Sequence, residues 1–108
     1  TMMVPFVAGG PSDITARVIA ARTGGILGQP MVAENRPGAN GAVAAQAMAR
    51  AAADGHTLLT GSIGVFAINA ALRPNLPYDP VRDFAPVTLA VTTPNVLVAN
   101  PTAMPARD

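Results

Sequence analysis

The chain has no lysine, no cysteine and no tryptophan among its 108 residues, and His56 is its only histidine. Without cysteine it can form no disulfide, no thiolate nucleophile and no cysteine-ligated metal site, which is compatible with any compartment. A single histidine disfavours a histidine-based zinc or catalytic site. We therefore expect neither a metal nor a cofactor in this chain.

Charge and aromatic residues are also scarce. Seven arginines and six acidic residues give a formal net charge of +1, and three phenylalanines and one tyrosine are the only aromatic residues. No basic run neutralises several phosphates, so nucleic-acid binding is disfavoured. No apolar run approaches the ~20 residues that span a bilayer. No leader pattern precedes the strand-like run after Thr1, which is typical of a start inside a longer protein.

Half of the residues are apolar, and alanine alone fills 22 positions. This length and composition predict one globular domain's worth of chain. Apolar runs predict strands, and alanine-dense or periodic stretches predict helices that pack closely on them. We expect strands at residues 2–7, 31–35, 56–60, 87–91 and 96–99, and helices at about 12–23, 39–53 and 65–72, the first ending at Gly24-Gly25.

A strand, a glycine turn and a helix recur at intervals of roughly 25–30 residues. This pattern predicts an α/β fold whose mostly parallel sheet lies between helices. The glycine turns at residues 8–12 and 61–64 then follow the carboxyl ends of strands, the edge where open α/β sheets bind ligands. Residues 73–86 contain four prolines and are expected to form a surface loop.

Each glycine turn feeds a helix, so unpaired N–H groups and the positive end of the helix dipole point at one place. Two such turns side by side suit a carboxylate or a phosphate, and Ser12 and Ser62 add hydroxyl groups. The glycines can equally serve turn geometry alone. Asp13 either accepts hydrogen bonds from a ligand or sits as a charge in the first helical turn, where Arg17 pairs with it at i,i+4.

Four ordered blocks resemble the Bug family, the extracytoplasmic solute receptors of tripartite tricarboxylate transporters. They are PFVAGGPSDITAR at 5–17, GQPMVAENRPGANG at 28–41, DGHTLL at 54–59 and LPYDPVRDFAPVT at 76–88. Together they span nearly the whole chain, and four in order are highly specific. His56 stands where the family usually has tyrosine, a difference expected to change packing only.

The resemblance implies a three-layer α/β lobe of the type 2 periplasmic-binding-protein kind and a periplasmic location. It also implies a non-enzymatic receptor that captures a small carboxylate for the membrane subunits of a tripartite tricarboxylate transporter. Residues 1–94 would form most of lobe 1, and residues 95–108 a crossover strand and the start of lobe 2. The ligand-binding residues that the family pattern carries over are Phe6, Ala8, Gly9, Gly10, Ser12, Asp13, Gly61, Ser62, Ile63 and Gly64.

Two other functions remain open. A small α/β enzyme acting on an anionic substrate at the same turns would need a general base, and His56 and Asp13 are the candidates in this chain. Alternatively, a lone lobe could act as a self-associating interaction module, since strands at 87–91 and 96–99 could pair with a second copy as a homodimer.

Overall fold

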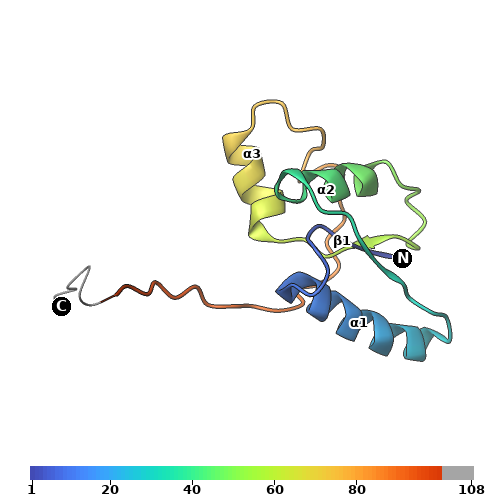
Figure 1. Ribbon diagram of the computed structural model, residues 1–108. Helices are drawn as coiled ribbons and strands as arrows, with labels where there is room; N and C mark the ends of the chain where they lie inside the picture. The colour runs from blue at the N-terminus through green and yellow to red at the C-terminus, as the bar shows by residue number, and fades with distance from the viewer. Residues whose placement is uncertain (101–108) are drawn as a thin grey trace.

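The computed structural model describes residues 1–100 and shows a small parallel sheet with helices on both faces (Figure 1). Its strands are β1 (Met2–Val4), β2 (Ala33–Asn35) and β3 (Leu58–Leu59), in the order β2-β1-β3. Met2 lies opposite Ala33 on one side and Leu58 on the other. β1 is the centre of the sheet because its three residues are all apolar and can be buried on both faces.

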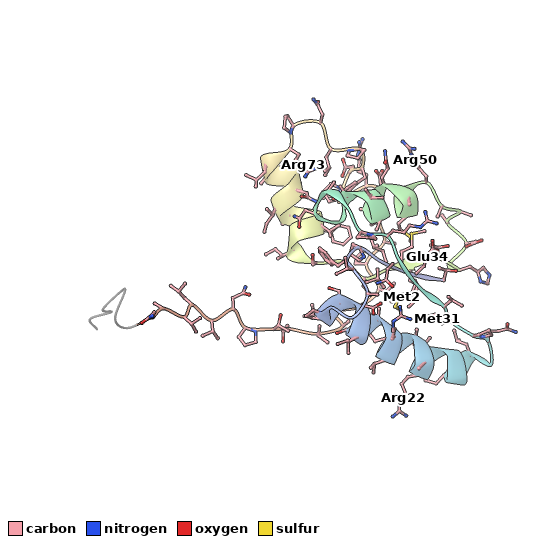
Figure 2. The ribbon with its side chains drawn as sticks, viewed as in Figure 1. Met2, Arg22, Met31, Glu34, Arg50 and Arg73 are labelled. Carbon is pink, nitrogen blue, oxygen red and sulfur yellow. The ribbon has the colours of Figure 1, made fainter. Side chains whose placement is uncertain are left out.

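Two helices cover opposite faces of this sheet (Figure 1). α1 (Pro11–Leu27) packs its alanines on one face, where Met2, Val4 and Ala16 form a buried cluster. Figure 2 shows Met31, which joins this cluster, beside Met2 between α1 and the sheet. α2 (Ala42–Ala49) covers the other face, where Ala42 and Ala45 are buried. The predicted layering of helix, sheet and helix is confirmed.

The predicted end of the first helix at Gly24-Gly25 is wrong. α1 continues to Leu27 and ends at Gly28, whose φ of 65° is left-handed and whose N–H donates to the Gly24 carbonyl. A Cβ at position 24 would lie 3.0 Å from the carbonyl oxygen of Gln29, so Gly24 lets the backbone that follows the helix pack closely against it. Glycine inside a helix costs roughly 1 kcal/mol relative to alanine, so α1 tolerates Gly24 and Gly25.

The remaining helices differ in length and type from their predictions. A short 3₁₀ turn, η1 (Ala39–Gly41), precedes α2, which ends at Ala49 instead of 53. After β3 the chain forms the π-helical turn η2 (Gly64–Ile68) and then α3 (Asn69–Leu72). Within residues 1–100, no helix is both long and apolar enough to cross a membrane.

The strands predicted at 87–91 and 96–99 do not form. Residues 85–100 carry no regular structure and leave the body as an extended arm (Figure 1), in which Leu97 is 98% exposed. A strand persists only where a neighbour pairs with its backbone, and within residues 1–100 no strand pairs with this arm. Residues 101–108 lie outside the described part, so the lobe boundary near residue 94 stays a prediction.

Candidate functional site

The two glycine turns follow neighbouring strands at the same edge of the sheet. β1 and β3 are parallel, and each is followed by one of the turns. After β1 the chain moves to the face that α1 covers, and after β3 it moves to the opposite face, where Val65 of η2 packs against Ala42. The connections therefore diverge between β1 and β3, the switch point at which sheets of this strand order bind ligands.

The first turn presents backbone to this edge. Ala8 and Gly9 are exposed, Phe6, Gly10 and Ser12 are half-buried, and Gly9 has a φ of +82°. Gly10 is the N-cap of α1, and no side chain in the described part of the chain caps that end of the helix. The first N–H groups of a helix have no partner within it, so the amides of Ser12 and Asp13 are available to a ligand.

Asp13 acts as an internal anchor beneath the first turn. Its side chain is only 4% exposed. Its Oδ2 accepts hydrogen bonds from the Gly9 N–H at 2.8 Å and from Arg17 Nε at 2.9 Å, and its Oδ1 accepts one from Asn35 Nδ2 at 2.9 Å. The Arg17 hydrogen bond, followed by those of Gly9 and Asn35, lowers the pKa of Asp13 to about 2. The predicted ion pair with Arg17 is confirmed, and the Gly9 amide is used within the turn.

Sequence reasoning missed Asn35, which ends β2 and ties it to the first turn. Asn35 Nδ2 donates one hydrogen bond to Asp13 Oδ1 and another to the carbonyl oxygen of Phe6, which lies 3.0 Å away. Asn35 Oδ1 accepts a hydrogen bond from Arg17 Nη2 at 3.0 Å. The available signal was an asparagine at the carboxyl end of an apolar run, the position from which a side chain reaches the edge where both turns lie.

The second turn leads directly into η2. The carbonyl of Ser62 accepts the N–H groups of Val65 and Phe66, each at 3.1 Å. Ser62 and Gly64 are half-buried, whereas Gly61 is exposed and the Ile63 side chain faces solvent. A Cβ on Gly61 would lie 1.9 Å from Phe66 Cε2, so a side chain at 61 would displace that ring.

A third segment, which precedes α2, lies against the second turn. Four consecutive residues there have positive φ: Gly38 at 138°, Ala39 at 49°, Asn40 at 55° and Gly41 at 83°. Asn40 Nδ2 donates to Asn69 Oδ1 at 3.1 Å and to the Gly64 carbonyl at 3.5 Å, and Asn69 Nδ2 returns a bond to the Asn40 carbonyl at 3.0 Å. This connection between β2 and α2 was not among the predicted site residues.

The π-helical turn is held from behind by Tyr78. Its hydroxyl donates to the carbonyl of Val65 and lies 3.4 Å from Asn69 Nδ2. All three residues are buried. Tyr78 packs edge-on against Phe84 with ring centres 5.7 Å apart, and Phe84 packs the same way on Phe66 at 5.1 Å. The proline-containing loop thus stabilises the second turn.

His56 lies away from both turns. It precedes β3, at the amino end of the strand, and it is exposed. Its N–H donates to Asp54 Oδ1 at 2.9 Å, and its carbonyl accepts the Thr1 amino group at 2.6 Å. Among residues 1–100, no three His, Cys, Asp or Glu side chains are placed to hold a metal ion. The enzyme hypothesis therefore loses His56 as a base at the glycine turns.

Comparison with known proteins agrees with this geometry. Residues 15–108 match the family described as the tripartite tricarboxylate transporter family receptor. The chain belongs to this receptor family. Protein BugT of Bordetella pertussis is 45% identical over 101 residues, which are 93% of this chain and 31% of that protein. A protein of Agrobacterium vitis from the TAR-I ttuE-ttuC' intergenic region is 47% identical over 98 residues, 91% of this chain and 28% of its own length.

Solved structures of periplasmic binding proteins share the fold. MatC from Rhodopseudomonas palustris with bound malate superposes with a TM-score of 0.75 at 48% identity, over 81% of this chain and 30% of that one. The periplasmic binding protein BugD gives a TM-score of 0.72 at 40% identity, over 77% of this chain and 27% of that one. This family membership and likeness confirm the predicted type 2 periplasmic-binding-protein fold. The chain spans only about 30% of the length of the receptors it matches.

Proposed function

We propose that this chain forms one wall of the ligand site of a periplasmic solute receptor that captures a small carboxylate for a tripartite tricarboxylate transporter. The observation that carries the proposal is the convergence of two glycine turns on the switch point between β1 and β3. Their uncapped backbone N–H groups and the positive helix ends suit a negative ligand. Similar structures hold malate in one case and adipate in another.

In this proposal the carboxylate meets backbone more than side chains. The amides of Ser12 and Asp13 approach it from α1, and those of Ile63 and Gly64 approach it from the second turn. Ser12 and Ser62 add hydroxyl groups. Phe6, Ala8, Gly10 and Gly61 line the turns, and Gly9 shapes the first turn while its own amide stays on Asp13 Oδ2.

The rest of a two-lobed receptor would supply the opposite wall, with residues 95–108 leading toward it. Periplasmic receptors of this kind close by hinge motion around the ligand, and the closed form would dock on the membrane subunits. Because half of the contacts would be absent, we expect the 108-residue chain alone to bind carboxylates weakly or not at all. Micromolar or tighter affinity of the isolated chain would contradict this expectation.

Titration calorimetry on a receptor of full family length that carries this chain tests the proposal. Malate, adipate and citrate are the probes, and at least one should bind. Ser12→Ala and Ser62→Ala should weaken that binding, because each removes a hydroxyl at a turn. Arg22→Ala is the matched control, since Arg22 extends from α1 into solvent away from the turns (Figure 2). Binding of a neutral ligand with failure of every carboxylate would overturn the proposal.

A homodimer is a second proposal, which the extended arm favours. Val87 and Leu97 are exposed, as is most of the apolar side-chain surface of the arm, and β3 is an edge strand of the sheet. The arm of one copy could pair with the β3 edge of another by strand exchange. Light scattering at high protein concentration tests this, and a strict monomer would rule it out.

A further inference from the structure

We propose that residues 35–41, which connect β2 to α2, set the spacing between the two glycine turns without touching the ligand. This inference rests on the proposed function, because it treats both turns as walls of one site. The segment contacts the residues that flank the first turn through Asn35, and the last residue of the second turn through Asn40. Gly41, the residue after Asn40, lies where Pro5, which follows β1, and Val65 of η2 come together.

The Asn35 end fixes the first turn through an amide whose hydrogen-bonding groups are all matched. Its Nδ2 supplies two hydrogens, which go to the Phe6 carbonyl at 3.0 Å and to Asp13 Oδ1 at 2.9 Å. Its Oδ1 faces the guanidinium of Arg17 at 3.0 Å. A reversed amide would set acceptor against acceptor and donor against donor, so the partners permit one orientation. Asn35 thereby connects the residues on both sides of the glycine turn.

The Asn40 end fixes the second turn in a similar way. Asn40 and Asn69 exchange two hydrogen bonds, of 3.1 Å and 3.0 Å, across 29 positions of sequence. The same Asn40 Nδ2 contacts the carbonyl of Gly64, the last residue of the turn, at 3.5 Å. Asn69 is buried, so its amide gives this end a rigid anchor.

Gly41 acts as the spacer between the two turns. A Cβ at this position would lie 2.6 Å from Val65 Cγ2 and 2.9 Å from Pro5 Cβ. Pro5 immediately precedes Phe6, and Val65 immediately follows Gly64. The backbone of Gly41 therefore holds Pro5, which leads into the first turn, and Val65, which follows the second turn, at a fixed separation. A ligand that bridges two sets of amides loses affinity when their separation changes by even about 1 Å.

Gly41→Ala tests the spacer, and Gly55→Ala is its matched control. Gly41 and Gly55 have φ values of +83° and +79°, so a side chain costs similar backbone strain at either position. Among residues 1–100, no atom lies within 4 Å of a Cβ at Gly55. We expect Gly41→Ala to shift the amide NMR signals of both turns in the 108-residue chain. In the full-length receptor it should weaken malate binding at least tenfold more than Gly55→Ala does. Equal effects of the two variants would overturn the proposal.

Two milder variants decide the matter if Gly41→Ala does not fold. Asn35→Ala should shift the amides of Gly9 and Ser12, and Asn40→Gly, which keeps the left-handed backbone, should shift those of Ser62 and Gly64. Each should weaken malate binding about threefold to tenfold, whereas the exposed Asn75→Ala should do neither. Unmoved turn amides in both variants would refute the positioning role. A wild-type receptor that binds no carboxylate would instead refute the proposed function, while the amide shifts would still report on positioning.

Discussion

Tyr78→Phe isolates the contribution of one buried hydroxyl to the second turn. The hydroxyl donates to the Val65 carbonyl and contacts Asn69 Nδ2 at 3.4 Å, and Tyr78 is only 5% exposed. Its removal leaves the Val65 carbonyl without this donor in a site that water does not reach. An unsatisfied buried polar group costs about 1–3 kcal/mol. The ring keeps its edge-on contact with Phe84, so the loss reflects the hydroxyl and not the packing.

Urea denaturation of the 108-residue chain followed by circular dichroism measures this loss. We expect the free energy of unfolding to fall by about 1–3 kcal/mol with an unchanged m-value, and each kcal/mol to lower Tm by roughly 4–8 °C. Phe84→Leu, which removes ring packing and leaves the hydroxyl, is the comparison variant. A loss below about 0.5 kcal/mol for Tyr78→Phe would show that the π-helical turn does not depend on this hydrogen bond.

Three further predictions concern other parts of the fold. The pKa of Asp13 is about 2 in the folded chain against 3.8 for the unperturbed group, so its stabilising effect is present above about pH 4 and is lost as the pH falls toward 2. Arg17→Gln should flatten this pH dependence of stability in acid titrations followed by circular dichroism. An unchanged profile would contradict the role of the Asp13–Arg17 pair. Gly61→Ala should cost about 1–3 kcal/mol in urea denaturation because its Cβ meets the ring of Phe66, and a neutral effect would mean that the ring moves freely. Gly28→Ala should lower Tm by the equivalent of about 1–2 kcal/mol from backbone strain alone, since no described atom lies within 4 Å of its Cβ. A loss well above that range would indicate a clash instead.

Local patterns in the sequence predicted the parts of the fold that depend on neighbouring residues. The i,i+4 spacing of Asp13 and Arg17 predicted their ion pair, and the recurring glycine turns predicted the parallel sheet. The four ordered blocks predicted the receptor family, which the family match over residues 15–108 confirms. These features depend on contacts within a few residues, or on a repeated unit, so the sequence carries them directly.

Features that depend on distant partners could not be predicted in this way. Asn35 reaches Asp13 across 22 positions, and Asn40 reaches Asn69 across 29, and neither pair shares a recognisable spacing. The apolar run at 87–91 has the composition of a strand, but composition does not supply the neighbouring strand that its backbone needs. The buried face of α1 is also not marked by large apolar residues, because α1 buries Ala16 and Ala20 while Ile14 and Val18 remain exposed.

The central place of β1 has a consequence for how the chain acquires its structure. β1 precedes β2 and β3 in the chain, yet Leu58 donates its N–H to the Thr1 carbonyl and Thr60 donates to that of Met3. A nascent chain that ends before residue 60 can pair β1 with β2 alone, and it leaves the other backbone edge of β1 open. Contacts between residues this far apart in sequence form slowly, so we expect the pairing of β1 with β3 to be completed late in folding.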